Sequence, residues 1–217
     1  MTDEREGKLS ASSANIVYHC PGAPALWKTL NHTEPESEIA AAGTRMHEAM
    51  ETGSTDVLED HNEERVVETM AALEKESADK WLGSLGSVAK LPPSFREFRL
   101  WIVNRKTQER LVSAKLDVHW VAIEQKAALA LDYKSGFLDV TEAERNVQTR
   151  IQALTLWHEY PFLERIRVGI VQGRTHKLDE ADYDRDTLEM AEKELLWHLW
   201  RSDQKDAPRI PGKHCRY

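Results

Sequence analysis

A short apolar run, Ala127 to Tyr133, constrains the fold of this chain more than any other segment. Its almost continuous hydrophobicity is typical of a central strand that is buried on both faces. Two strand-like segments precede it, Phe95–Val103 and Leu111–Ile123, and the connections between the three are short and polar. Because short connections join antiparallel strands and parallel strands need long crossovers, the three segments predict an antiparallel meander.

Helical patterns lie on both sides of the predicted meander. Before it, helices are predicted at 37–52 and 61–82. After it, a helix begins with the capping box Thr141-Glu-Ala-Glu144 and runs to about Tyr160, and it is followed by a strand at Arg165–Gln172 and a helix at 184–201. This order predicts an α/β fold, in which a mixed central sheet (the meander, a helix and a fourth strand) is flanked by helices.

The length of 217 residues suits one domain with a full hydrophobic core. We expect residues 1–9 to form a flexible tail and residues 10–217 to form that domain, with Ser10 as the N-cap of a short first helix. No apolar run is long enough to span a membrane, and the charged N-terminus does not resemble a secretory signal. The sequence therefore predicts a cytoplasmic protein without a membrane partner.

The net charge of −8 argues against one class of nucleic-acid-binding protein. Proteins that coat nucleic acid without sequence preference are normally basic, because neutralising phosphates supplies most of their affinity. A nuclease is not excluded, since its acids gather around a metal ion and its basic residues can form a local track.

Two acids and a lysine stand out at the ends of the predicted strands. Asp132 and Lys134 close the apolar run and are followed by Gly136, and Asp117 lies on the preceding strand. Side chains two residues apart on a strand share a face. Two carboxylates and the Tyr133 carbonyl suit Mg²⁺, while an ammonium beside them could orient water or offset charge during phosphodiester hydrolysis. The alternative is an exposed ion pair at a strand end, which the strand context disfavours.

His47 is a further candidate ligand. Gly43, His47 and Glu51 recur every four residues and therefore share one face of a predicted helix. The glycine permits close approach to a sheet, the imidazole could bind a metal and favour Mn²⁺, and Glu51 could orient His47 or hold a second ion. A surface histidine without a metal remains the alternative.

The two cysteines each follow a histidine, near opposite ends of the chain. The set His19, Cys20, His214 and Cys215 contains the ligand types of a zinc site, although adjacent ligands are poorly spaced for one. Two reduced thiols are the alternative reading.

Taken together, the spaced motifs resemble the RecB-type branch of the PD-(D/E)XK nucleases, including phage and prophage members. The resemblance covers about residues 9–216 and rests on Gly43-Thr-x-x-His47-x-x-x-Glu51, Asp117, Asp132-Tyr-Lys134-x-Gly136, Gln148, and the flanks around Cys20-Pro21 and Pro211-Gly-Lys-His-Cys-Arg216. It implies a restriction-endonuclease-like core and Mg²⁺ or Mn²⁺ held by His47, Asp117, Asp132 and the Tyr133 carbonyl. It also implies that Lys134 assists hydrolysis and that Gln148 orients Lys134 or a phosphate.

The resemblance further implies an exonuclease of phage-type DNA recombination or processing, with DNA as substrate and a phage single-strand annealing or recombination protein as a partner. For a phage-encoded protein the location would be the cytoplasm of the bacterial host. Two alternatives stay open: a DNA-end-binding module of the same fold without catalysis, and a metallohydrolase acting on another substrate.

The sequence departs from the family pattern at three places. Gln152 stands where a Tyr often follows Gln148, and Ala114 replaces a common Gly before Asp117. Related nucleases often hold a [4Fe–4S] cluster with four cysteines, of which Cys20 and Cys215 match the first two. Two thiolates cannot hold that cluster, so it is expected only if the native chain supplies further cysteines.

Overall fold

The structure is a computed structural model that describes residues 7–27, 37–86, 90–137, 140–212 and 214. Its strands are β1 (Leu9–Ser10), β2 (Ser94–Val103), β3 (Arg110–Ala122), β4 (Ala127–Lys134), β5 (Arg165–Gln172) and β6 (Lys177–Asp184). Its helices are α1 (Ala11–His19), α2 (Ala23–Trp27), α3 (Glu38–Thr52), α4 (His61–Ser84), the 3₁₀ turn η1 (Ala143–Arg145), α5 (Val147–Glu159) and α6 (Arg185–Ser202).

One mixed sheet contains all the described strands, in the order β1-β3-β4-β5-β6, with β2 also paired to β3. The meander β2-β3-β4 is antiparallel, and β4 pairs with β5 in parallel after the crossover through α5. The predicted fold class is therefore confirmed, as a mixed central sheet flanked by helices.

Two strands were missed by the sequence analysis. Leu9, which we assigned to a tail, forms β1 with Ser10 and pairs in parallel with β3. β6 extends the other end of the sheet and pairs antiparallel with β5. Each is short or rich in acids, so neither carries the apolar run that identified β4.

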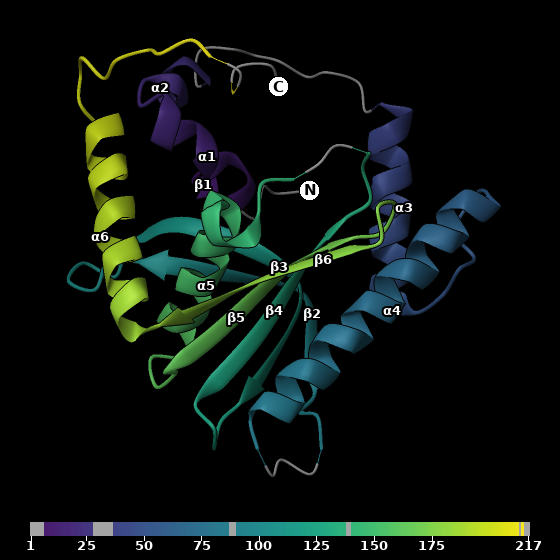
Figure 1. Ribbon diagram of the computed structural model, residues 1–217. Coiled ribbons are helices and arrows are strands. Elements are labelled where there is room, and N and C mark those ends of the chain that lie inside the picture. The colour runs from purple at the N-terminus through teal and green to yellow at the C-terminus, as the bar shows by residue number, and fades with distance from the viewer. Residues whose placement is uncertain (1–6, 28–36, 87–89, 138–139, 213, 215–217) are drawn as a thin grey trace.

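The helices form two layers around the sheet (Figure 1). α3 and α4 cover one face, where Met46, Met70 and Trp81 pack with Leu129 and Leu131 of β4. α5, with α1 and α6 beside it, covers the other face. α5 is buried over most of its length, which explains why its sequence shows little amphipathic contrast.

The start of α5 differs from the prediction. The capping box at Thr141 was wrong, because the helix begins at Val147 and the Asn146 side chain accepts a hydrogen bond from the Gln148 amide at 2.9 Å. The preceding turn is held by tertiary bonds instead: the Ala143 amide donates to Asp179 of β6 at 3.2 Å, and the Thr149 hydroxyl donates to the Ala143 carbonyl at 2.6 Å. These contacts outweigh the local motif.

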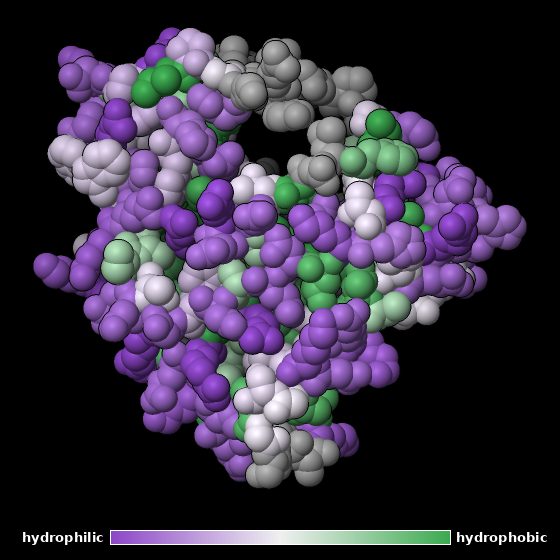
Figure 2. All heavy atoms as spheres, in the orientation of Figure 1, coloured by the Kyte–Doolittle hydropathy of each residue, from purple (hydrophilic) through white to green (hydrophobic). Residues whose placement is uncertain are grey.

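Hydrophilic side chains cover most of the molecular face seen in Figure 2. The apolar side chains lie mainly between the layers, as expected for a chain in which 30% of residues are charged. None of the helices in the described ranges is both long and apolar enough to cross a membrane.

Gly173, directly after β5, lies against α4. A Cβ atom there would come within 2.7 Å of Met70 Cγ and Val66 Cγ1, and within 2.9 Å of the Val66 carbonyl oxygen. Because a backbone atom cannot move aside cheaply, we expect Gly173→Ala to lower the free energy of unfolding by about 1–3 kcal/mol. Urea denaturation followed by circular dichroism measures this. The control is Gly83→Ala on α4, where nothing lies within 4 Å and the free energy should be unchanged or higher.

Candidate active site

The candidate site lies where β3 and β4 separate. The last pair of residues in their ladder is Val118 and Leu131. Asp117 and Asp132 follow next on each strand, and the Asp117 carboxylate accepts a hydrogen bond from the Tyr133 amide at 2.6 Å. The Asp117 side chain thus reaches across the gap between the strands to the residue after Asp132, and the charges of the two acids interact.

Asp117 is almost fully buried, at 9% exposure. Burial raises the pKa of its carboxyl group, and the neighbouring Asp132 charge adds to the rise, while His47 and the Tyr133 amide act against it. A buried carboxylate close to a second carboxylate is costly without a cation nearby. This is the electrostatic environment that a bound cation would relieve.

His47 of α3 faces Asp117 across this gap. Its Nδ1 lies 3.5 Å from Asp117 Oδ1 and 3.9 Å from Glu97 Oε1. Among the described residues, these three form the one group of metal-binding side chains whose donor atoms all lie within 4.8 Å of one another. Burial opposes protonation of His47, but the two carboxylates outweigh it and raise the pKa of the imidazole to about 10.

Glu97 of β2 was missed by the sequence analysis. The register places it opposite Asp117, and its φ of 51° is unusual for a residue within a strand. This backbone turn lets Arg96 and Glu97 contact the helices α4 and α3 on the same face of the sheet, through Glu74 and His47. The signal that could have revealed it is an acid in an apolar strand, in register with Asp117.

Lys134 and Asp132 lie against α5, close enough to Asp117 for their charges to interact. Lys134 Nζ is 2.8 Å from Asp132 Oδ2, and it donates to Gln148 Oε1 at 3.1 Å. Burial disfavours the charge on Lys134, but Asp132 outweighs it and the pKa of the amine is raised above its usual value. Lys134 is therefore an ammonium group that can donate hydrogen bonds but cannot take a proton from water.

Two glutamines of α5 hold Asp132. Gln148 Nε2 donates to Asp132 Oδ1 at 2.6 Å, and Gln152 Nε2 donates to the same oxygen at 2.8 Å. The sequence analysis included Gln148 but treated Gln152 only as a departure from the family pattern. Because the two are one helical turn apart, both can reach one carboxylate.

The backbone of Tyr133 faces the candidate metal site, and its phenol group makes a structural contact. Since the amide and carbonyl of one strand residue point to the same side, the Tyr133 carbonyl is directed, like its amide, toward the gap beside Asp117. The phenol on the other end bonds to Glu74 and Arg96. Burial and Glu74 raise the pKa of this phenol, so it remains neutral and anchors β4 to α4.

The remaining predicted residues line a shallow cleft beside Asp117, of about 660 Å³, formed by α3, β2 and β3. Glu51 is exposed in this cleft, and the described contacts of His47 go to Asp117 and Glu97 rather than to Glu51. Gly43 lies close to the sheet end, as predicted, since a Cβ there would be 3.3 Å from Ser135 Oγ. Lys115 forms an ion pair with Glu97.

The segments around Cys20 and Ile210 contact each other away from this site. The rings of His19 and His214 stack with their centroids 5.3 Å apart, and the buried Cys20 Sγ accepts a hydrogen bond from the Ile210 amide at 3.3 Å. Cys215 lies outside the described residues. His19, Cys20 and His214 do not form a group of donor atoms comparable to that of His47. One described cysteine cannot hold a four-cysteine iron–sulfur cluster, so the described residues do not support this cofactor.

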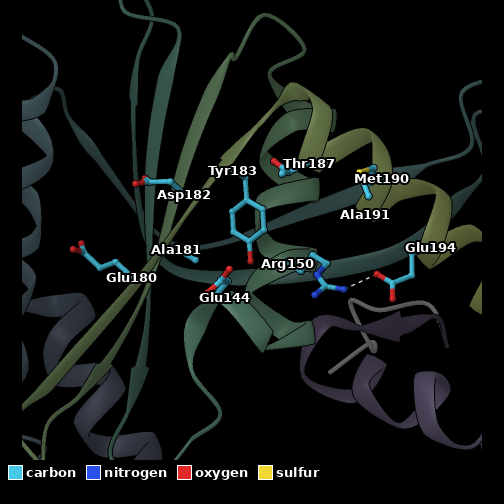
Figure 3. A pocket seen from close by; sticks show the side chains of 10 residues that line it. All are labelled: Glu144, Arg150, Glu180, Ala181, Asp182, Tyr183, Thr187, Met190, Ala191 and Glu194. Atoms are coloured by element: carbon cyan, nitrogen blue, oxygen red, sulfur yellow. Dashed lines mark hydrogen bonds and ion pairs between the residues drawn. The ribbon is translucent and has the colours of Figure 1, made fainter.

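A larger cavity of about 740 Å³ lies between β6, η1, α5 and α6 (Figure 3). Four carboxylates line it, from Glu144, Glu180, Asp182 and Glu194, and Arg150 pairs with Glu194 at 2.5 Å. Four carboxylates also line the cleft beside Asp117, from Glu48, Glu51, Glu97 and Asp117, so charge alone does not separate the two. The smaller cleft is the candidate site because it contains His47, Glu97 and Asp117, which could hold a metal ion.

The model of the PD-(D/E)XK nuclease superfamily matches residues 8–217. The chain belongs to this superfamily. A match over nearly the whole chain supports a nuclease, and His47, Glu97 and Asp117 form a candidate group for a metal ion.

One solved structure shares the fold of this chain. The crystal structure of a proposed exonuclease from Eubacterium rectale matches with a TM-score of 0.54 and 12% identity, over 91% of this chain and 82% of the other. A second structure, that of SSO0001, matches with a TM-score of 0.28 and 10% identity, over 87% and 86% of the two chains, which is too distant to indicate a shared fold. A comparison with curated protein sequences gave no significant match.

The side chains present fit a divalent metal. The donor set combines buried carboxylate oxygens, a strand carbonyl and an imidazole, which suits Mg²⁺ and, through the nitrogen, Mn²⁺. The raised pKa of Asp117 supports this assignment, because a buried acid gains from a nearby cation.

The pH dependence of metal binding tests the role of His47. Its raised pKa of about 10 means that the ring is protonated at neutral pH and must lose this proton to bind a metal. We therefore expect Mn²⁺ affinity to rise between pH 6.5 and 8.5, by up to about tenfold per pH unit, with release of a proton. Isothermal titration calorimetry in two buffers of different ionisation enthalpy measures both quantities. His47→Gln should flatten the slope; an unchanged slope would exclude His47 as a ligand.

Proposed function

We propose that the chain is a divalent-metal-dependent deoxyribonuclease that hydrolyses phosphodiester bonds as an exonuclease. The observation that carries this proposal is that two buried acids, Asp117 and Asp132, stand next to each other where β3 and β4 separate and interact through their charges, with the Lys134 ammonium 2.8 Å from Asp132. A structural ion pair alone does not require two buried acids on adjacent strands. Two neighbouring acids are expected where a metal ion binds a phosphate group.

Asp117, Asp132, His47 and the Tyr133 carbonyl would hold Mg²⁺ or Mn²⁺, with Glu97 as a further oxygen donor. When bound, the metal polarises the phosphoryl group and lowers the pKa of a coordinated water. Lys134 donates hydrogen bonds to the attacking water or to the phosphate and offsets the charge that develops there. Because Lys134 is itself protonated, the proton of the water must pass to solvent or to a phosphate oxygen rather than to this amine.

Gln148 connects the two halves of this machinery. It accepts from Lys134 with Oε1 and donates to Asp132 with Nε2, and it thereby fixes the ammonium relative to the carboxylate. This supports the predicted role of Gln148 in orienting Lys134. Glu51, on the rim of the cleft, is proposed to act only indirectly, through the negative potential it adds.

The exonuclease assignment and the role in phage-type recombination rest on the resemblance to the RecB-type branch. The same resemblance suggests a single-strand annealing or recombination protein as a partner. A domain of residues 10–217 would carry all the residues named above.

A DNA-end-binding module without catalysis is the second candidate. It shares the fold, but it has no need for Lys134 to be held at hydrogen-bond distance from Asp132. A hydrolase of RNA or nucleotides is the third, since the fold does not decide the substrate.

A nuclease assay separates these candidates. Labelled linear and covalently closed circular DNA, and RNA of the same sequence, are incubated with the protein and Mg²⁺ or Mn²⁺, with EDTA as the metal-free control. The proposal expects EDTA-sensitive degradation of linear DNA, with circular DNA resistant. Cleavage of circular DNA would exclude a strict exonuclease, and binding of DNA ends without cleavage would favour the second candidate.

A further inference from the structure

We infer that Gln152 is a positioning residue for the metal centre, which holds the Asp132 carboxylate so that its Oδ2 atom alone faces the site. This inference deepens the proposed function and rests on it, because Asp132 matters here as a metal ligand. Gln152 is the residue that departs from the family pattern of Gln-x-x-x-Tyr, so its role belongs to this chain.

The geometry assigns different tasks to the two oxygens of Asp132. Oδ1 accepts two amide hydrogen bonds, from Gln148 at 2.6 Å and from Gln152 at 2.8 Å. Oδ2 lies 2.8 Å from the Lys134 ammonium. Two donors on one oxygen fix the torsions of the carboxylate and draw its negative charge toward Oδ1. The cation would then be bound through one oxygen rather than both.

The orientation of the Gln152 amide follows from the chemistry of its partner. An ionised carboxylate only accepts hydrogen bonds, so the nitrogen of Gln152 must face Asp132. The amide oxygen then points into the core, where Oε1 is buried and has no hydrogen-bond partner among the described residues. Gln152 itself is 1% exposed.

This buried, unpartnered oxygen makes Gln152 a poor residue for stability alone. Leaving a buried acceptor unpaired costs free energy, and no hydrogen bond from the described residues offsets that cost for Gln152 Oε1. An apolar side chain would fill the same space without that cost. What it would lose is the hydrogen bond to Asp132, so the bond is the feature that the glutamine provides.

Gln152 also differs from Gln148 in having one task. Gln148 contacts both Lys134 and Asp132, so its replacement would disturb the ammonium and the carboxylate together. Gln152 contacts Asp132 alone among the charged groups of the site. Groups that hold a metal ligand in place typically change metal affinity or activity by about 10–100-fold when removed.

The experiment measures Mn²⁺ binding by isothermal titration calorimetry, independently of cleavage. Gln152→Met keeps the volume and removes the donor, and we expect its Mn²⁺ dissociation constant to rise about tenfold or more. Thr155→Val is the matched control, because Thr155 is buried on the same helix and its hydroxyl bonds only to the Gln152 carbonyl, at 2.8 Å. This control should bind Mn²⁺ like the wild type. Without metal, Gln152→Met should unfold at or above the temperature of Thr155→Val.

A double-mutant cycle with Asp132→Asn shows whether Gln152 acts through Asp132. If it does, Gln152→Met weakens Mn²⁺ binding in the wild type but has no further effect beside Asp132→Asn. Equal losses in both backgrounds, or wild-type affinity in Gln152→Met, would overturn the inference. Should Gln152→Met fail to fold, Gln152→Leu takes its place.

The double-mutant cycle and the nuclease assay test the positioning role and the proposed function independently. A protein that cleaves DNA while Gln152→Met binds Mn²⁺ normally refutes the positioning role and keeps the proposed function. A protein that does not cleave DNA, yet shows the coupling between Gln152 and Asp132, refutes the proposed function and keeps the positioning role.

Discussion

Replacing Lys134 with Met is expected to lower the kcat of metal-dependent DNA cleavage by about 10²–10³-fold, the usual loss when one donor to a developing charge is removed. Lys134 is held by Asp132 and Gln148, and its raised pKa keeps it charged at neutral pH. Met fills the space of the side chain without a charge or a donor. Single-turnover cleavage of end-labelled DNA at saturating Mn²⁺ measures the effect.

Metal binding separates a catalytic role of Lys134 from a structural one. In the structure its ammonium neutralises the same Asp132 oxygen that would face the cation, so removing it should leave Mn²⁺ affinity unchanged or higher. Lys126→Met is the control, since Lys126 is exposed and pairs with Glu164 at 2.6 Å. A parallel loss of cleavage and Mn²⁺ affinity in Lys134→Met would contradict the assignment of Lys134 to the chemical step.

The sequence predicted the central part of the fold because its strands differ in composition from everything around them. β4 is an apolar run with short loops before it, and β5 alternates apolar with polar residues, so both are recognisable in isolation. β6 contains four acids in eight residues and is held in the sheet by pairing with β5. Two residues, as in β1, give no periodicity at all.

In the candidate site, too, some residues could be predicted from the sequence and others could not. Asp117, Asp132, Lys134 and Gln148 follow from their order along the chain; in the structure Asp132 contacts Lys134 and Gln148, while Asp117 bonds to the neighbouring Tyr133 amide. Glu97 depends on a positive φ and on the β2–β3 register, neither of which is visible as a sequence pattern. Gln152 was noted only as a departure from the family pattern, whereas its amide reaches Asp132 directly.

Asp132 is the residue whose neutralisation should cost most. Its carboxylate is 4% exposed and connects the Lys134 ammonium, both glutamines and the proposed cation site. In Asp132→Asn the remaining oxygen can still accept from Gln148 and Gln152, so the fold should persist. The side chain then offers no charge to a metal and places an amide donor against the ammonium. We expect the rate of cleavage to fall roughly 10³-fold or more, since both metal and ammonium lose their shared partner.

A double variant tests whether Asp132 and Lys134 act together in catalysis. If Asp132 and Lys134 act as one unit, the double variant of Asp132→Asn and Lys134→Met should be about as inactive as Asp132→Asn alone, because residues of one catalytic unit do not contribute independently. Single-turnover rates of the two single variants and the double variant decide this. Asp182→Asn is the control, since Asp182 is an exposed acid that pairs with Arg167 at 2.8 Å. Rate losses that multiply in the double variant would place the two residues in separate steps, and near-normal cleavage by Asp132→Asn would remove the acid from the metal centre altogether.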